Sequence, residues 1–211
     1  MSRLIVALDC ENALEIAKKI ADYVYAFKVN YPLVLKKGLS IIEELSDISK
    51  VIADFKIADV PHISSQIAEC AFNAGANAVI VHAFVGSDTL SSVVRLSKNY
   101  DGEVYAVCEL SSEGGKEFMM PISEKLAELA VKTGCSGIVA PATRVERIKT
   151  LRKIVGNLKI ISPGVGAQGG KALEALKAGA DYVIVGRRII KGDALKNIKE
   201  VIKEMEGLYG N

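Results

Sequence analysis

Short apolar runs alternate with amphipathic stretches along the chain, and the alternation repeats eight times. Each apolar run is rich in Val and Ile and is almost continuous in apolarity. This pattern is typical of parallel strands that are covered on both faces. The runs predict eight strands, at residues 4–9, 25–29, 51–56, 78–83, 104–110, 137–141, 159–165 and 182–186.

The stretches between these runs carry their apolar residues on one helical face. In the first stretch, Ala13, Ile16, Ala17 and Ile20 share a face, and positions 195, 198, 201, 202 and 205 do so in the last. Eight strand–helix units without a long linker predict a closed (β/α)8 barrel, a TIM barrel, with residues 1–211 as a single domain. The main alternative is an open doubly wound sheet. It is disfavoured because no Gly-x-Gly-x-x-Gly follows the first strand.

Several small residues predict where helices begin and end. Gly75, Gly134 and Gly179 each follow a helical stretch, at the place where a left-handed glycine is favoured. Ser87 and Ser123 each precede an acidic residue and are predicted to cap the helices that follow.

Composition narrows the class of protein. The chain has 211 residues, enough to bury a substantial core. Its 27 Lys and Arg nearly balance its 25 Asp and Glu, so the chain lacks the excess of basic residues that is typical of nucleic-acid binding. An anionic ligand would therefore need a local binding site. The four cysteines form no C-x-x-C pair, and with only two histidines they predict reduced thiols rather than a zinc site.

The location predicted from these features is the cytoplasm, where cysteines stay reduced. A strand-like run begins at Leu4, which leaves no room for a signal peptide. No apolar run approaches the roughly 20 residues that cross a bilayer. We therefore expect no membrane partner.

Charged residues stand where a barrel enzyme carries its chemistry, at the carboxyl ends of the strands. Asp9 ends the first predicted strand and Lys28 lies near the end of the second. The third ends in Asp54-Phe-Lys56, with Asp59 shortly beyond. Residues two apart on a strand point to the same side, so Asp54 and Lys56 are predicted to face the barrel interior together.

A buried salt bridge that only closes the barrel mouth is the structural alternative. It is disfavoured because buried ion pairs often stabilise a fold no better than well-packed apolar residues. Two acids and two bases that converge on a cleft are better explained by chemistry, since perturbed charges gather at functional sites.

Two glycine-rich connections follow the last two strands. The first is Ser-Pro-Gly-Val-Gly-Ala-Gln-Gly-Gly at 162–170, and the second is Gly186-Arg187. Glycines let backbone N–H groups approach an anion, and an arginine grips phosphate bidentately. Barrels commonly hold phosphate in these two loops. The alternative is that these are only tight connections between strand and helix. The arginine, and the location of both loops after the last two strands, favour a phosphate site instead.

Two further residues are candidates near the barrel mouth. Ser111 opens a small, polar loop after the fifth strand and is predicted to contact ligand, the alternative being a simple surface connection. His82 ends the fourth strand, where a lone histidine is more often a hydrogen-bonded packing residue. His62 begins a helix and is predicted to lie at the surface or an interface.

The segment Asp54-Phe-Lys-Ile-Ala-Asp59-Val-Pro resembles the D-x-K-x-x-D signature of the orotidine 5′-monophosphate decarboxylases. That signature alone identifies only a wider suprafamily. The resemblance nevertheless covers essentially the full chain and is strongest to the short archaeal-type members. It includes Leu-Asp at 8–9, Phe-Lys-Val-Asn-Tyr-Pro at 27–32, Glu-Leu-Ser at 109–111, the glycine-rich segment 162–170 and Val-Gly-Arg at 185–187.

The resemblance implies decarboxylation of orotidine 5′-monophosphate to UMP, in pyrimidine biosynthesis, without metal or organic cofactor. It implies that Lys56 donates the proton to C6 of the pyrimidine, beside Asp54 and the substrate carboxylate. Lys28 and Asp59 complete a Lys-Asp-Lys-Asp array. Decarboxylation leaves negative charge near C6, which a fixed ammonium stabilises, and neighbouring carboxylates favour the charged ammonium.

Substrate contacts are implied in the same way. Asp9 and Lys28 hold ribose hydroxyls, and Ser111 contacts the pyrimidine edge. The residues implied in phosphate binding are Pro163, Gly164, Val165, Gly166, Gln168, Gly186 and Arg187.

A two-fold homodimer is also implied, in which Asp59 enters the neighbouring subunit's site. Many members carry a threonine four residues after this acid, where it contacts ligand across the dimer. Here Ile63 stands in its place, so the pattern lacks that hydroxyl contact.

Two other functions fit parts of the pattern. A Mg²⁺-dependent sugar-phosphate aldolase or decarboxylase, similar to 3-hexulose-6-phosphate synthase, needs acids placed as metal ligands. Lys28, the Asp59-Val-Pro continuation and Gln168 argue against it. A non-catalytic nucleotide-binding barrel has no need for Lys56 between two acids.

Overall fold

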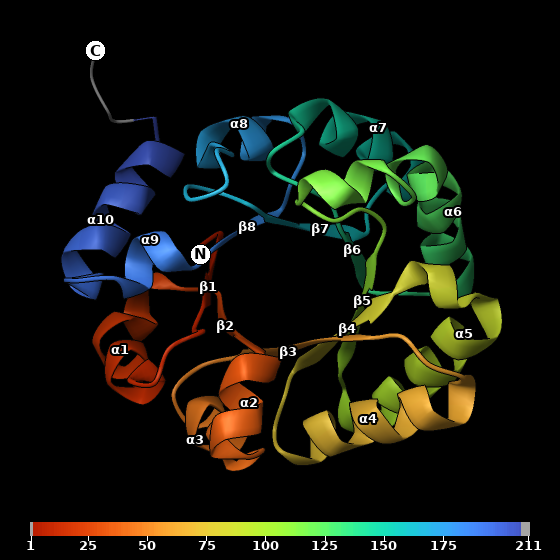
Figure 1. Cartoon of the computed structure of the whole chain (residues 1–211), viewed down its shortest axis with the longest axis horizontal. Coiled ribbons are helices and arrows are strands. Elements are labelled where there is room, and N and C mark those ends of the chain that lie inside the picture. The colour runs from red at the N-terminus through yellow and green to blue at the C-terminus, as the bar shows by residue number, and fades with distance from the viewer. Residues whose placement is uncertain (1, 208–211) are drawn as a thin grey trace.

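Eight parallel strands close into a barrel in the computed structural model, which describes residues 2–207. Each strand pairs with the next in the chain, and the first also pairs with the last, Ile5 lying opposite Ile184 (Figure 1). The strands are β1 (Leu4–Ala7), β2 (Ala26–Asn30), β3 (Val51–Ile57), β4 (Ala78–His82), β5 (Glu103–Val107), β6 (Gly137–Val139), β7 (Lys159–Pro163) and β8 (Tyr182–Val185). The predicted TIM barrel is confirmed.

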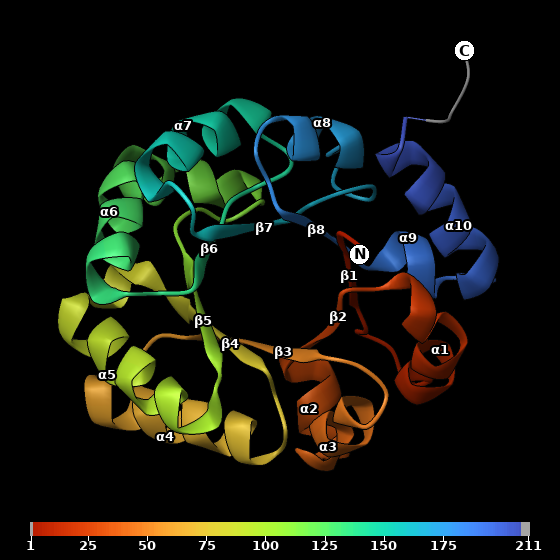
Figure 2. The same cartoon turned by 180° about the vertical axis from the view of Figure 1, so that it is seen from behind.

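Helices surround the barrel on its outside, as both views show (Figures 1 and 2). They are α1 (Ala13–Ile20), α2 (Tyr31–Lys37), α3 (Ser40–Ser46), α4 (Pro61–Asn73), α5 (Ser87–Ser97), α6 (Ser123–Thr133), α7 (Val145–Val155), α8 (Ala172–Lys177), α9 (Arg187–Ile190) and α10 (Ala194–Met205). The predicted stripe on α1 is confirmed, because Ala13, Ile16, Ala17 and Ile20 are all buried. The core is therefore a layer of apolar side chains between strands and helices.

Several strands end earlier than the apolar pattern predicts. β1 ends at Ala7 rather than at 9, β5 at Val107 rather than at 110, and β7 at Pro163 rather than at 165. The pattern overruns because the chain stays buried just past the strand ends, as at Leu8 and Cys108. Their N–H groups still donate to the carbonyl oxygens of Lys28 and Val139 in the neighbouring strands, so burial and hydrogen bonding both continue past the last strand residue.

The helix-end predictions have mixed outcomes. Gly75, Gly134 and Gly179 have φ of +90°, +78° and +113°, which confirms the left-handed glycines. The serine caps are wrong, since Ser87 and Ser123 are the first residues of their helices and no side-chain cap precedes either. The Ser123 hydroxyl instead donates to the carbonyl oxygen of Met120.

The four cysteines are free thiols, as predicted. Among residues 2–207, no helix combines the length and the apolarity that crossing a membrane requires.

Candidate active site

A cavity of about 320 Å³ opens at the carboxyl ends of the strands. This volume lies within the range of small-molecule sites. The cavity brings together almost all of the predicted site residues, from six different strand ends and the loops that follow them. Those that line it are Asp9, Lys28, Asp54, Lys56, Ser111, Pro163, Gly164, Val165, Gln168, Gly186 and Arg187.

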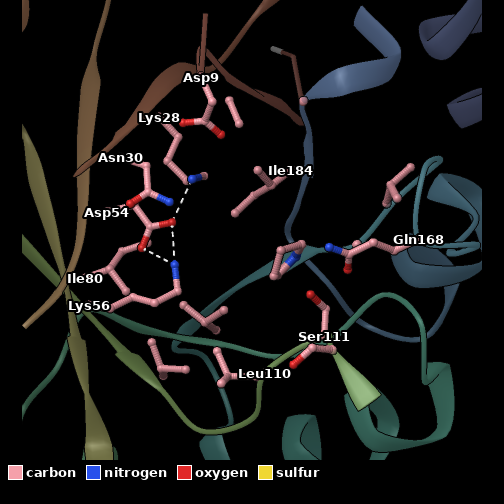
Figure 3. A pocket seen from close by; sticks show the side chains of 18 of the residues that line it. Asp9, Lys28, Asn30, Asp54, Lys56, Ile80, Leu110, Ser111, Gln168 and Ile184 are labelled. Atoms are coloured by element: carbon pink, nitrogen blue, oxygen red, sulfur yellow. Dashed lines mark hydrogen bonds and ion pairs between the residues drawn. The ribbon is translucent and has the colours of Figure 1, made fainter. Parts of the chain in front are cut away.

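Three charged side chains form a continuous chain on one wall of this cavity (Figure 3). The Lys28 Nζ lies 2.6 Å from Asp54 Oδ2. The Lys56 Nζ lies 2.8 Å from Asp54 Oδ1 and 2.9 Å from Oδ2. One carboxylate therefore orients two ammonium groups, and the three together carry a net positive charge where an anionic ligand would enter.

Burial differs along this chain of charges. The side chains of Lys28 and Asp54 are 7% and 6% exposed, whereas that of Lys56 is 35% exposed. Burial by itself would raise the pKa of the Asp54 carboxyl, but the two ammonium groups outweigh it and the pKa lies below its usual value. Asp54 is therefore a fixed anion, and Lys56 is the most exposed of the three side chains that line the cavity.

The backbone at Lys56 is unusual for a residue with a side chain. Its φ is +42°, in the left-handed region, and the pairing of β3 with β4 shifts register between Ala53 and Ile57. A non-glycine residue held in that region costs of order 1–3 kcal/mol, and such residues cluster at functional sites. Asp54 and Lys56 do face the cavity together, but regular alternation is not the reason, because β3 is irregular at this point.

The opposite wall carries Ser111 and Gln168 (Figure 3). Both approach Gly164, where an added Cβ would lie 3.0 Å from Ser111 Cβ and 3.1 Å from Gln168 Oε1. Gly164 also has a φ of +100°. Glycine at this position therefore lets the loops after β5 and β7 meet beside the cavity.

Gly166 lies outside the lining of the main cavity, unlike its neighbours in the predicted phosphate loop. It borders an adjoining shallow hollow together with Arg187, Arg188 and Lys191. Its N–H donates to the carbonyl oxygen of Gly170 at 2.9 Å, and its φ is +79°. Gly166 therefore shapes the loop, and its N–H is already occupied.

Asp59 is not part of the cavity of its own chain. Its carboxylate is exposed and accepts a hydrogen bond from the Val60 N–H, while its carbonyl oxygen accepts from Ser64 Oγ and Thr89 Oγ1. Ser64 therefore holds the Asp59 backbone, and its hydroxyl does not stand in for the threonine that Ile63 replaces.

Sequence reasoning missed several lining residues. Asn30 lies opposite Asp54 in the sheet and two residues beyond Lys28, so the two-residue period of β2 was a signal that could have found it. Glu109 and Leu110 also line the cavity. The Glu109 carboxylate is fully buried between Arg144 and Arg147, which lie more than 30 residues further along the chain. No local pattern indicates that contact.

His82 packs as predicted but is not hydrogen-bonded as predicted. Its ring lies against Phe84, with centroids 4.5 Å apart. Its Nδ1 is buried and has no hydrogen-bond partner within residues 2–207. The pKa of His82 is lowered to about 4, mainly because the ring is buried and also because Lys56 is nearby. His82 is therefore a neutral packing residue at neutral pH.

This pKa predicts a specific loss of stability in acid. An unfolded histidine has a pKa of 6.5, so the folded chain is fully stable with respect to His82 above that pH and loses stability as the pH falls from 6.5 towards about 4. We expect the urea midpoint of the parent to fall over this window, and that of His82→Gln to fall less. Parallel curves for the two proteins would contradict the expectation.

The sequence model of the orotidine 5′-phosphate decarboxylase / HUMPS family matches residues 2–201. The orotidine 5′-phosphate decarboxylase of Methanococcoides burtonii is 53% identical over 209 residues, which cover 97% of each chain. That of Thermococcus kodakarensis is 50% identical over 194 residues, which cover 89% of each chain. These relatives match along most of their own length.

Solved structures agree with the sequence comparisons. The orotidine 5′-monophosphate decarboxylase of Methanocaldococcus jannaschii, in complex with the inhibitor BMP, superposes with a TM-score of 0.92 at 41% identity. The match covers 97% of this chain and 99% of that one. With its barrel, its charged array and these full-length matches, the chain belongs to the orotidine 5′-phosphate decarboxylase / HUMPS family.

Proposed function

We propose that this protein is a carboxy-lyase that converts orotidine 5′-monophosphate to UMP in pyrimidine biosynthesis. The observation that carries the proposal is the array of Lys28, Asp54 and Lys56 at the barrel mouth. Relatives with this name match over the full chain, which supports the same activity. The array offers an ammonium for the reacting carbon, and the glycine-rich loops opposite offer a place for the phosphate.

The pyrimidine end of the substrate lies at the charged array in this proposal. The bond between C6 and the carboxylate breaks, carbon dioxide leaves, and the electron pair stays on C6. Lys56 Nζ then gives its proton to C6. An ammonium fixed 2.8 Å from Asp54 stabilises the charge that develops there without having to reorient. The buried Asp54 carboxylate also repels the substrate carboxylate, which favours its departure.

The phosphate end lies on the other side of the cavity, against Gln168, Arg187 and the backbone near Gly164. Ser111 contacts the pyrimidine edge, and Asp9 and Lys28 hold ribose hydroxyls. The phosphate is remote from C6, so its binding energy serves to hold the pyrimidine against Lys56. That remote binding raises the rate as well as the affinity.

Metal and cofactor independence are part of the proposal. The Mg²⁺-dependent alternative needs several acids gathered as ligands. In the part of the chain that the structure describes, no three His, Cys, Asp or Glu side chains are placed to hold a metal ion. The charged array instead contains one carboxylate and two ammonium groups, which suits proton donation better than metal binding.

The assembly we propose is a two-fold homodimer in which Asp59 enters the partner's cavity. The exposed Asp59 borders a shallow hollow together with the apolar residues Val60, Pro61 and Val85, and Val60 is 60% exposed. An exposed apolar surface of this kind is typical of an interface. We also propose a cytoplasmic location, which suits the four free thiols.

An absorbance assay of orotidine 5′-monophosphate loss tests the proposed function. We expect turnover at the same rate with and without EDTA, after the protein has been dialysed against chelator. Activity that disappears with chelator and returns with Mg²⁺ would favour the metal-dependent alternative. UMP binding without any turnover would favour a nucleotide-binding barrel.

Arg187→Ala is expected to raise KM for orotidine 5′-monophosphate by about a hundredfold while lowering kcat much less. The reason is that a charge-assisted contact to phosphate contributes about 2–3 kcal/mol and lies far from C6. Steady-state kinetics on the purified variant measure both constants. The matched control is Arg95→Ala, an exposed arginine on α5, which should leave both unchanged. An equal loss in kcat and unchanged KM would place Arg187 at the reacting carbon instead.

A further inference from the structure

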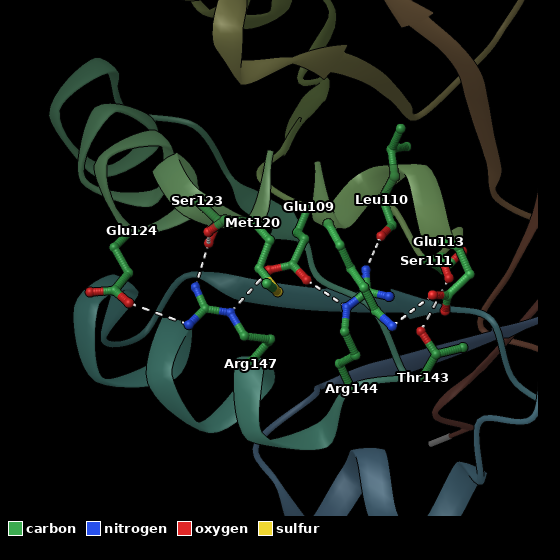
Figure 4. Close-up of polar contacts among 11 residues, drawn as sticks. Glu109, Leu110, Ser111, Glu113, Met120, Ser123, Glu124, Thr143, Arg144 and Arg147 are labelled. Atoms are coloured by element: carbon green, nitrogen blue, oxygen red, sulfur yellow. Dashed lines mark hydrogen bonds and ion pairs between the residues drawn. The ribbon is translucent and has the colours of Figure 1, made fainter. Parts of the chain in front are cut away.

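A fully buried carboxylate lies behind the loop that carries Ser111 (Figure 4). Glu109 follows β5, and its Oε1 accepts a hydrogen bond from Arg144 Nε at 2.7 Å. Its Oε2 accepts from Arg147 Nε at 3.1 Å. Arg144 immediately precedes α7 and Arg147 lies in its first turn, so one carboxylate joins the segment after β5 to the segment after β6.

The two arginines use their remaining N–H groups on the two ends of one segment, residues 110–124. Arg144 Nη2 donates to the carbonyl oxygen of Leu110. Arg147 Nη2 donates to Ser123 Oγ, and its Nη1 lies 3.3 Å from Glu124. The segment that covers one side of the cavity is thereby held at its beginning and at its end by the same pair of side chains.

Ser111 lies immediately beside the first of these attachments. Its carbonyl oxygen accepts a hydrogen bond from Thr143 Oγ1 at 3.2 Å, and Thr143 precedes Arg144 in the chain. Residues 143–147 therefore fix the backbone on both sides of the Ser111 side chain. Glu109 fixes residues 143–147 in turn, because a buried carboxylate between two guanidinium groups holds both in one place.

We propose that Glu109 is a positioning residue for the pyrimidine end of the site. It acts through Arg144 and Arg147, and this inference rests on the proposed function. Without its charge, Arg144 and Arg147 lose the buried carboxylate between them, and only Arg147 keeps an ion pair, with the half-exposed Glu124, which disfavours the observed arrangement. The phosphate end of the site is held separately, because Arg187 begins α9, after β8, and within residues 2–207 it forms no ion pair with Glu109.

Glu109→Gln is the direct test, since it keeps the shape of the side chain and removes its charge. Three quantities are measured: kcat/KM for orotidine 5′-monophosphate, the Kd for UMP, and the Kd for ribose 5-phosphate, which lacks the pyrimidine. We expect kcat/KM to fall and the UMP Kd to rise by about tenfold or more, with the ribose 5-phosphate Kd unchanged within about twofold. The matched control is Glu146→Gln, an exposed glutamate on α7 that pairs with Lys149 on the same helix.

Other outcomes would overturn the inference. UMP affinity and kcat/KM within about twofold of the parent would show that Glu109 has no positioning role. Equal losses for UMP and ribose 5-phosphate would show a general structural role. If Glu109→Gln does not fold, Arg144→Lys takes its place with the same readouts, because it keeps a cation beside Glu109 but loses the contact to Leu110. Failure of the proposed function is recognised separately, by a parent that does not turn over orotidine 5′-monophosphate.

Discussion

Lys56→Ala is expected to abolish turnover of orotidine 5′-monophosphate, a loss of at least about 10⁴-fold, and to leave UMP binding largely intact. The variant removes the proton donor and the cation nearest C6 together, and each of these effects contributes about 10²-fold or more. UMP carries neither the carboxylate nor the developing charge, so its affinity depends little on this ammonium. Single-turnover kinetics and calorimetric titration with UMP measure the two effects.

The fold of the Lys56→Ala variant should be unaffected. The Lys56 side chain is one-third exposed, and Asp54 keeps its 2.6 Å contact with Lys28. Its melting temperature should therefore stay close to that of the parent. Lys132→Ala, at an exposed position on α6, is the control for removal of a lysine. Near-normal rates in Lys56→Ala would reject the mechanism. If the parent and the variant bind UMP equally and neither turns over orotidine 5′-monophosphate, the protein is a nucleotide-binding barrel rather than an enzyme.

The architecture was predictable because it depends on which residues are buried, and the apolar pattern of the sequence indicates those residues directly. Parallel strands covered on both faces read as apolar runs, and eight runs with short connections leave few arrangements other than a closed barrel. The same logic placed Asp9, Lys28 and Asp54 at strand ends. A charge at the end of an apolar run in such a fold has to face the mouth of the barrel.

Other features of the site depend on contacts that no local pattern carries. Lys56 reaches the cavity through a left-handed backbone and a register shift in β3, which regular alternation does not describe. The family resemblance implied a phosphate contact for Gly166, yet its N–H donates to the carbonyl oxygen of Gly170 within the loop. Glu109 meets its arginines only because the loops after β5 and β6 are neighbours in the closed barrel.

Asp59 presents a different case, since its predicted role involves a second subunit. A mixing experiment gives a definite expected result. Asp59→Ala and Lys56→Ala are each expected to be nearly inactive alone. If the Asp59 of one subunit serves the Lys56 of the other, a mixed dimer of these variants contains one site with both residues intact. After subunit exchange at equal concentrations, about a quarter of the parent activity should therefore return, because half of the dimers are mixed and half of their sites are complete.

The matched control mixes Lys56→Ala with Asp54→Asn. Asp54 and Lys56 belong to the same chain and are 2.8 Å apart, so no mixed dimer contains a complete site and no activity should return. Activity measured against mixing ratio distinguishes the cases, since recovery should peak at equal amounts. If the Asp59 mixture recovers nothing while subunit exchange is demonstrated, Asp59 acts within its own chain or not at all. Its exposed position, away from its own cavity, would then have to change on ligand binding for it to take part in the reaction.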